Sequence, residues 1–266
     1  MNDTLHPSAW EGCLKTEKLG RGENRVLECT DSTNVQLRKM ALAGAPHGSL
    51  CISETQTSGK GRLGRSWESP AGKGLWLSVL LRPDLKPEQA PLVTLCAAIA
   101  MAKAVKETSG VDAKIKWPND LVYDGRKVCG VLLEIGATVE KINYIIVGTG
   151  LNVHEGAYSP DLQDKAAALA EFTVPPLRRE ILTAYLAALE DVVARVEKDG
   201  FEAIREEYVH CSCTIGSEVR VIGAVNLTGR AIGIEESGAL LVRTEDGEMH
   251  RVLAGDVSVR GVMGYV

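Results

Sequence analysis

Up to about residue 213, the apolar positions form short runs and longer periodic stretches, which are typical of strands and helices respectively. The short runs predict strands over Arg25–Cys29, Leu50–Glu54, Leu75–Leu81, Ala113–Trp117, Leu121–Tyr123, Lys127–Ile135 and Tyr144–Val153. The longer stretches predict helices over Asn34–Ala43, from Pro87 to about Ser109, over Leu177–Lys198 and over Glu202–Tyr208. This part of the chain therefore combines helices with a cluster of strands.

The pattern changes near Cys213–Gly216. Short alternating strands follow, over Glu218–Ile222, Thr228–Ile234, Ala239–Val242 and Met249–Leu253, with turn residues between them. They predict a small antiparallel barrel. Residues 1–23 are polar, with Trp10 as the only large anchor, and are expected to be a weakly structured extension. The expected organisation is thus an extension (1–23), a larger domain (24–213) and a small C-terminal domain (214–266).

Composition and charge exclude several classes of protein. Apolar residues make up 45% and charged residues 24% of the 266 positions, which is ordinary for a globular protein. The net charge of −5 gives no general attraction to nucleic acid, so any basic site must be local. The apolar stretch near Pro91–Val105 is interrupted by Thr94 and Lys103 and is short for a membrane span. Without a signal peptide pattern, a cytoplasmic location is the default expectation.

The segment Glu54–Trp67 (ETQTSGKGRLGRSW) is rich in glycine and cations. Its glycines match GxGxxG by letter, but the stretch Arg65–Pro70 will not open a helix, as a dinucleotide fingerprint requires. Glycines allow a backbone to approach a ligand closely, and Lys60, Arg62 and Arg65 suit a phosphate ester. The segment is either a loop that binds phosphate or a mobile, solvated surface loop.

A second polar segment is Lys116–Gly130 (KWPNDLVYDGRKVCG). Asn119 and Asp120 stand at the junction of two predicted strands, where polar side chains can point into a cleft. Lys127 begins an apolar strand, and an ammonium held there can stabilise a reacting phosphate or carboxylate. A lysine at the start of a strand is also typical of a solvated sheet edge, so both interpretations stay open.

Two further segments are ambiguous by themselves. In Val147–Val153 (VGTGLNV), Gly148 and Gly150 interrupt an apolar strand, which indicates either a bulge or a closely packed ligand. The stretch DSTN at 31–34 is typical of a helix cap. The same hydroxyl and backbone N–H groups can also bind a small polar head group.

Taken in order, DSTN, ETQTSGKGRLGRSW, KWPNDLVYDGRKVCGVLLE and VGTGLNV strongly resemble the biotin–protein ligase family over about residues 25–155. The GxGRxGR and KWPND elements together are close to diagnostic. The resemblance implies an α+β fold, in which a mixed sheet flanked by helices forms a class II synthetase-like catalytic domain. A small SH3-like β-barrel would follow it. The implied activity is activation of biotin with ATP as biotinyl-5′-AMP, and transfer of the biotinyl group to a lysine of a biotin carboxyl carrier protein.

The resemblance also implies roles for individual residues. Lys127 and Arg62 would be catalytic. Biotin would be bound by Ser32, Thr33, Asn34, Gln56, Lys60, Gly61, Arg62, Lys127, Gly130, Gly148 and Gly150. ATP or the adenylate would be bound by Arg62, Arg65, Trp67, Asn119, Lys127 and Asn152. Asp120 would contact Mg²⁺.

These residue types suit that chemistry. A carboxylate is already a nucleophile, so adenylation needs alignment and cations rather than a serine, a cysteine or a base. Mg²⁺ is expected to bridge the ATP phosphates, and a closed loop would keep water from the reactive anhydride. Two alternatives stay open, namely a lipoate–protein ligase and a ligand-binding regulator without turnover.

The resemblance finally predicts partners. The carrier domain of a biotin-dependent carboxylase is the expected acceptor, and family members often pair through the central sheet, which predicts a homodimer. Some members carry an N-terminal winged helix-turn-helix that binds operator DNA. Because DSTN begins at residue 31 here, the sequence predicts a monofunctional ligase that binds no specific DNA and no membrane.

Overall fold

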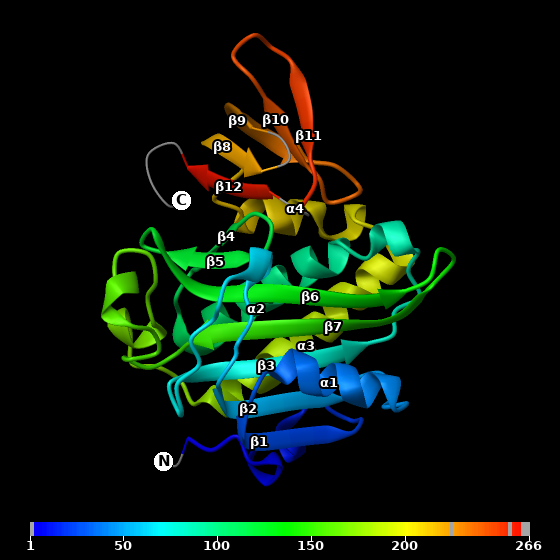
Figure 1. Cartoon of the computed structure of the whole chain (residues 1–266), viewed down its shortest axis with the longest axis vertical. Helices are drawn as coiled ribbons and strands as arrows, with labels where there is room; N and C mark the ends of the chain where they lie inside the picture. Colours follow the sequence, from blue (N-terminus) through cyan, green and yellow to red (C-terminus); the bar gives the residue numbers. More distant parts are fainter. Residues whose placement is uncertain (1–2, 224–225, 255–256, 262–266) are drawn as a thin grey trace.

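The computed structural model of the chain describes residues 3–223, 226–254 and 257–261, and its strands form two sheets (Figure 1). The larger sheet consists of β1 (Asn24–Thr30), β2 (Leu50–Gln56), β3 (Gly74–Leu81), β4 (Lys114–Lys116), β5 (Asp120–Tyr123), β6 (Arg126–Ala137) and β7 (Ile142–Asn152). Their order across the sheet is β1-β2-β3-β7-β6-β5-β4. The sheet is mixed, because β1 and β2 run parallel while the other neighbours are antiparallel. Each predicted strand of this region is confirmed.

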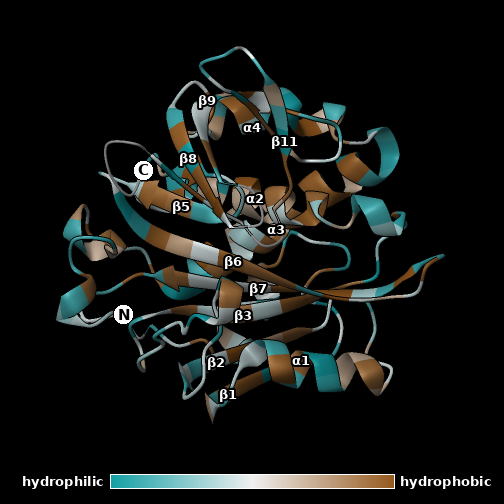
Figure 2. Ribbon diagram, turned by 45° about the horizontal axis from the view of Figure 1, so that its top comes forward, coloured by the Kyte–Doolittle hydropathy of each residue, from teal (hydrophilic) through white to brown (hydrophobic). Residues whose placement is uncertain are grey.

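Helices cover both faces of this sheet (Figure 1). The helix α1 (Thr33–Leu42) lies on one face, and α2 (Leu92–Ser109) and α3 (Arg178–Asp199) lie on the other, with α4 (Glu202–Cys211) beside them. Alternation along β2 explains the two layers: Cys51 packs with the buried face of α1, whereas Leu50 and Ile52 belong to the large core with α2 and α3. The apolar residues of the central strands stand out in Figure 2. The predicted α+β architecture is therefore confirmed.

The apolar helix of the core also meets a criterion for membrane spans. By length and composition alone, the stretch Pro87–Ser109 is long and apolar enough to cross a membrane, but 72% of its apolar window is buried inside the protein. It begins with a 3₁₀ turn (Pro87–Gln89), and Gly110 closes it with a φ of 74°. Burial against α3 and the sheet accounts for its apolar composition.

The N-terminal segment is ordered, so the expectation of a weakly structured extension is wrong. Short 3₁₀ turns form at Pro7–Ala9 and Glu11–Cys13, and both Leu5 and Trp10 are fully buried. The guanidinium of Arg178 on α3 holds the segment, donating to the Asp3 carboxylate (2.9 Å) and backbone carbonyl (2.7 Å). The same guanidinium donates to Glu54 on β2 (2.7 Å). The segment is therefore packed and ion-paired against the larger domain.

The smaller sheet is antiparallel throughout and consists of β8 (Glu218–Gly223), β9 (Leu227–Ile234), β10 (Leu240–Arg243), β11 (Met249–Val252) and β12 (Val257–Gly261), in the order β11-β10-β9-β8-β12. The four predicted strands are present, and β12 was not predicted. Residues 224–225, 255–256 and 262–266 of the predicted C-terminal domain lie outside the described residues. Closure of the sheet into an SH3-like barrel stays a prediction.

Trp117 joins the two sheets. Its backbone N–H donates to Thr214 Oγ1 (2.9 Å), and its indole N–H donates to the carbonyl of Gly238 (3.1 Å), in the turn between two strands of the smaller sheet. The side chain is 2% exposed. The KWPND segment is thus anchored by the C-terminal domain as well as by its own sheet.

Candidate active site

A cavity of about 490 Å³ lies on the α1 face of the larger sheet. It is lined by all the residues predicted to bind biotin, ATP or magnesium, namely Ser32, Thr33, Asn34, Gln56, Lys60, Gly61, Arg62, Arg65, Trp67, Asn119, Asp120, Lys127, Gly130, Gly148, Gly150 and Asn152. They come from segments more than a hundred residues apart. The fold therefore brings the four sequence motifs together at one place.

Three glycines form the floor of the cavity. Gly130 of β6 pairs directly with Gly150 of β7, without a register shift at Gly148 or Gly150, so the bulge interpretation is wrong. A Cβ on Gly148 would lie 2.1 Å from Asn34 Oδ1, and one on Gly150 would lie 2.5 Å from Trp67 Nε1. Glycine is required at both positions because other side chains lie directly on the sheet.

Hydroxyl and amide groups surround the end of the cavity next to α1. Thr33 donates from its backbone N–H (2.9 Å) and its hydroxyl (3.2 Å) to Gln56 Oε1. Ser78 Oγ donates to Asn34 Oδ1 (2.6 Å), and Asn34 Nδ2 donates to Glu134 Oε1 (3.2 Å). Ser32 is the N-cap residue of α1 but makes no side-chain cap bond. This end offers neutral donors and acceptors in a fixed arrangement.

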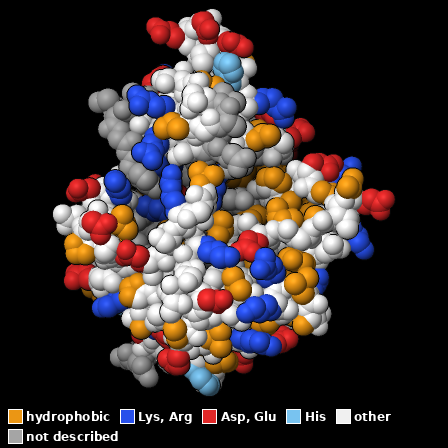
Figure 3. Space-filling model, viewed as in Figure 1, with side chains coloured by type: hydrophobic (Ala, Val, Ile, Leu, Met, Phe, Trp, Pro, Cys, Tyr) orange, Lys and Arg blue, Asp and Glu red, His pale blue; other side chains and the backbone are white. Residues whose placement is uncertain are grey.

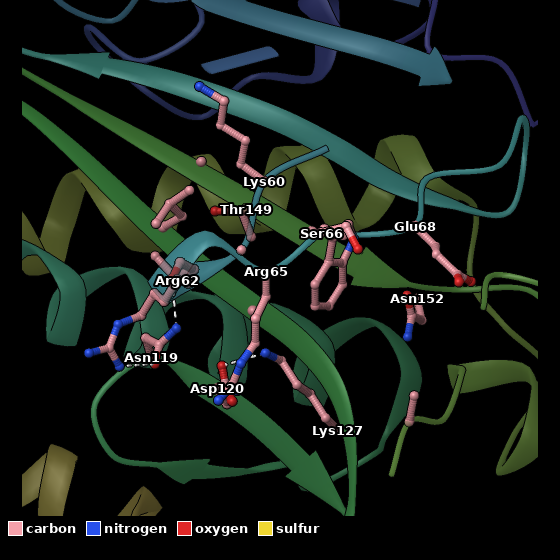
Figure 4. A pocket seen from close by; sticks show the side chains of 18 of the residues that line it. Lys60, Arg62, Arg65, Ser66, Glu68, Asn119, Asp120, Lys127, Thr149 and Asn152 are labelled. Atoms are coloured by element: carbon pink, nitrogen blue, oxygen red, sulfur yellow. Dashed lines mark hydrogen bonds and ion pairs between the residues drawn. The ribbon is translucent and has the colours of Figure 1, made fainter. Parts of the chain in front are cut away.

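The glycine- and arginine-rich loop covers the cavity in a compact turn. Gly61 N–H donates to the carbonyl of Arg65 (2.7 Å), and a 3₁₀ turn over Arg62–Gly64 places Leu63 at a φ of 57°. Arg62 points inward, where it donates to Asn119 Oδ1 (3.0 Å) and to the carbonyl of Ala254 beyond β11 (Figure 4). The Lys60 side chain points away from Lys127 and Asp120 (Figure 4). Only the backbone of Lys60 is thus placed to serve the cavity.

Lys127 stands at the centre of the site. Its ammonium lies 2.7 Å from Asp120 Oδ1 and 5.0 Å from the ring centroid of Trp67 (Figure 4). Both charged side chains are largely buried. The buried indole N–H of Trp67 has no hydrogen-bond acceptor among the described residues. An oxygen-rich ligand placed beside Lys127 would supply one.

The side chains of Asn119 and Asn152 also have structural partners. Asn119 Nδ2 donates to the carbonyl of Val131 (2.8 Å), while Asn152 Nδ2 donates to that of Ala167 (3.1 Å). These bonds fix both amides where they line the cavity. Asn119 and Asp120 thus occupy the strand junction that the sequence predicted.

Several cavity residues were not predicted as site residues. Among them are Lys116, Tyr158, Lys165 and the stretch Ser258–Arg260 of β12. Lys116 is 6% exposed, and burial lowers the pKa of its ammonium to about 8 although the nearby Asp120 opposes this shift. Lys116 is the first residue of KWPND, but no role was predicted for it, because a single lysine on a short strand gives no sign in the sequence that it is buried.

The cavity is locally cationic in a protein of net charge −5. Apart from Lys60, whose side chain points away, the charged residues that line it are Arg62, Arg65, Lys116, Lys127, Lys165 and Arg260 against Glu68 and Asp120. Lys and Arg side chains also gather at the junction between the smaller sheet and the rest of the molecule (Figure 3). One end of the cavity is therefore neutral, and the remainder suits a ligand that carries several negative charges.

Comparisons with known proteins agree with this geometry. The model of the Biotin/lipoate A/B protein ligase family matches residues 26–152, and that of the Biotin protein ligase C terminal domain matches residues 214–260. The chain belongs to the biotin/lipoate protein ligase family. The predicted membership in the biotin–protein ligase family is therefore confirmed, both for the region of the motifs and for the C-terminal strands.

Relatives and solved structures extend the likeness over most of the chain. A Biotin–[acetyl-CoA-carboxylase] ligase of Mycobacterium tuberculosis is 32% identical over 96% of this chain and 97% of its own length. The Bifunctional ligase/repressor BirA of Bacillus subtilis is 32% identical over 92% of this chain and 76% of its own length. The structure of biotin protein ligase from Aquifex aeolicus in complex with biotin and ATP superposes with a TM-score of 0.79 at 29% identity, covering 90% of this chain and 99% of that one.

Proposed function

We propose that this protein is a biotin–protein ligase, which converts biotin and ATP to biotinyl-5′-AMP and then transfers the biotinyl group to a lysine of a carrier protein. The observation that carries the proposal is the junction of a neutral, hydrogen-bonding end with a cationic region at Lys127, inside one cavity. Biotin has a neutral ureido ring at one end and a carboxylate at the other. Its carboxylate would therefore meet the α-phosphate of ATP beside Lys127.

The neutral end favours biotin over lipoate. The groups of Thr33, Asn34 and Gln56 can donate to and accept from a ureido ring, which itself has one carbonyl and two N–H groups. The dithiolane ring of lipoate has none of these groups and could form no such hydrogen bonds, each of which contributes about 0.5–1.5 kcal/mol. Ser32, with its hydroxyl free of capping, adds a further candidate partner for the ring.

In the first step, a carboxylate oxygen of biotin attacks the α-phosphorus, and the bond from that phosphorus to the pyrophosphate oxygen breaks. Lys127 stabilises the charge on the carboxylate and the α-phosphate, and Asp120 orients its ammonium. Arg62 and Arg65 neutralise phosphate oxygens, while the indole N–H of Trp67 donates to the adenylate. Gly130, Gly148 and Gly150 let the ligand lie flat against the sheet.

Magnesium would arrive with ATP. Mg²⁺ is usually held by one or two carboxylates together with substrate phosphates and water. Asp120 fits such a role, being a carboxylate in the cavity beside Asn119. Within the described residues, no three His, Cys, Asp or Glu side chains gather as a metal site. When bound, the ion would supply further neutralisation of phosphate charge.

In the second step, the neutral amine of the carrier lysine attacks the carbonyl carbon of the adenylate. The C–O bond to AMP breaks, AMP leaves with the electron pair, and the amine loses its proton to solvent. The loop over Gly61–Arg65 lines the cavity and is held there by the contact of Arg62 with Asn119, so it would limit the access of water to the anhydride.

The decisive experiment is ATP–pyrophosphate exchange measured with biotin, with lipoate and with no vitamin, followed by transfer to a carrier fragment. Biotin-dependent exchange and biotinylation of one lysine are expected. Exchange with lipoate alone would identify a lipoate ligase. Biotin binding without exchange would identify a regulator without turnover, and either result would refute the proposal.

The proposed partner is the carrier domain of a biotin-dependent carboxylase, and the proposed location is the cytoplasm, without specific DNA or a membrane as partner. A homodimer through the larger sheet belongs to the same proposal. The end of β6 supports it, since residues 132–137 extend beyond β5 and pair with β7 alone among the described strands. Light scattering with and without biotin and ATP tests the dimer. Biotin-dependent retention of a specific DNA fragment would contradict the partner assignment.

A further inference from the structure

Lys116 shares a row of the larger sheet with the floor of the active site. Gly150 of β7 pairs with Gly130 of β6, Gly130 pairs with Asp120 of β5, and Asp120 pairs with Lys116 of β4. Directly paired residues on neighbouring strands present their side chains on the same face. Lys116 therefore belongs to the cavity face, one strand beyond Asp120.

Strand spacing places Lys116 in relation to the reacting phosphate. Neighbouring strands lie about 4.8 Å apart, so Lys116 starts one such step beyond Asp120, whose carboxylate holds the ammonium of Lys127. Along this row, the neutral floor under the vitamin comes first, then the Lys127–Asp120 pair, then Lys116. This order of neutral and cationic groups matches a ligand whose negative charge increases from the carboxylate of biotin toward the phosphates of ATP.

The geometry of in-line displacement indicates which part of ATP lies at this end of the cavity. The attacking carboxylate and the leaving group must stand on opposite sides of the α-phosphorus. With the vitamin over Gly148 and Gly150, the leaving group departs away from those glycines and toward the far end of the row. Arg62 points to the same end, because it donates to Asn119, the neighbour of Asp120 (Figure 4).

We propose that Lys116 binds the β- and γ-phosphates of ATP and the departing pyrophosphate, and thus acts in the adenylation step alone. This inference rests on the proposed ligase function and adds a substrate-binding residue to it. When the bond between the α-phosphorus and the bridging oxygen breaks, the electron pair goes to pyrophosphate. The Lys116 ammonium keeps its proton and stabilises that charge. Because it is 6% exposed, little water screens the interaction.

A structural role for Lys116 makes different predictions. The residue also borders a small crevice with Cys213, Thr214 and Val219 at the junction of the two sheets. If it served only to hold the domains together, its replacement would impair adenylation and transfer alike. A residue that binds pyrophosphate is needed only while pyrophosphate is attached or leaving.

The test therefore separates the two half-reactions in Lys116→Met. The matched control is Lys114→Met, because Lys114 lies two residues earlier on β4, pairs with Asp112 (2.8 Å) and does not line the cavity. For Lys116→Met we expect the KM for ATP and the inhibition constant of pyrophosphate to rise roughly ten- to hundredfold, the effect of losing a charged hydrogen bond. The KM for biotin and transfer from chemically prepared biotinyl-5′-AMP should stay within about twofold of the unmodified protein.

Two outcomes would overturn the inference. Equal losses in adenylation and in transfer from the prepared adenylate would overturn it in favour of a structural role. Unchanged inhibition by pyrophosphate would overturn it as well. Should Lys116→Met be unstable, Lys116→Gln permits the same comparison, and Lys116→Arg should retain more affinity for pyrophosphate than either. If the unmodified protein itself shows no biotin-dependent exchange, it is the proposed function that fails, which keeps the two failures distinguishable.

Discussion

Replacing Gly148 with alanine should damage the vitamin end of the cavity while leaving the cationic region intact. The new Cβ would lie 2.1 Å from Oδ1 and 2.8 Å from Cγ of Asn34, so the amide must move. Asn34 has little room to do so, because it is 4% exposed and hydrogen-bonded to Ser78 and Glu134. The clash is therefore relieved only by breaking these bonds or by shifting α1.

The size of the effect follows from two costs. Overpacking a well-packed site costs about 1–3 kcal/mol, and a buried polar group that loses its partner costs a similar amount. We expect the free energy of unfolding to fall by about 2–4 kcal/mol, with a loss of about 2–4 °C in Tm for each kcal/mol. Because Asn34 lines the cavity and belongs to the proposed biotin site, the Kd for biotin should rise roughly ten- to hundredfold.

Calorimetric titration with biotin and thermal unfolding measure the two effects. The control is Gly233→Ala in β9, where an added Cβ meets no atom within 4 Å. The double variant Asn34→Ala/Gly148→Ala removes the obstructing amide. In the Asn34→Ala background, Gly148→Ala should therefore lower the free energy of unfolding much less. If Gly148→Ala costs the same with and without Asn34, contact between the two is not the cause, and our reasoning about the glycine floor is refuted.

Four further predictions concern the charged residues. Lys127→Ala should nearly abolish biotin-dependent ATP–pyrophosphate exchange while the protein still unfolds cooperatively; normal turnover would remove Lys127 from the mechanism. Arg62→Ala and Arg65→Ala should each speed the release of biotinyl-5′-AMP, measured by rapid filtration, and unchanged retention in both would mean that the loop does not hold the adenylate. Arg178→Met should lower the free energy of unfolding by about 3–5 kcal/mol, because the largely buried carboxylates of Asp3 and Glu54 lose their guanidinium partner. A loss below about 1 kcal/mol would contradict this. Burial raises the pKa of Asp3, but hydrogen bonds from His154 and Arg178 outweigh it and leave that pKa below its usual 3.8. The ionised carboxylate therefore stabilises the protein above pH 3.8, and this contribution is lost as the pH falls further. In Asp3→Asn, the free energy of unfolding should accordingly depend less on pH in this acid range.

Local patterns were enough to predict the strands of the larger sheet and its helices, while the resemblance to a known family supplied the site residues that the structure brings to one cavity. Each motif also carries a conformational signal of its own: glycines where side chains cross the sheet, a serine at the N-cap position of α1, and a polar junction at Asn119. The sequence could not distinguish a bulge from a close contact at Gly148 and Gly150, because both place glycine in the same pattern of apolar residues. The register of β6 and β7 decided between them.

The rest depends on contacts between residues distant in sequence. Asp3 lies 175 positions from Arg178, and Trp117 lies 121 positions from Gly238. A polar N-terminal segment is therefore ordered by an ion pair that its own sequence does not reveal. The burial of Lys116 likewise results from the approach of β12 and the smaller sheet. The strand β12 was missed although its sequence, VSVRG, alternates apolar and polar residues.

The indole of Trp117 has a consequence for how such chains can be recombined. Because the backbone N–H of Trp117 donates to Thr214 and its indole N–H donates to Gly238, a C-terminal module borrowed from a distant relative must reproduce that hydroxyl and that carbonyl to hold the tryptophan in place. A graft that misplaces them would tilt the neighbouring KWPND residues and impair nucleotide affinity without altering any residue of the vitamin pocket. Chimeras should therefore tolerate exchange of the outer loops of this module far better than exchange of its inner surface.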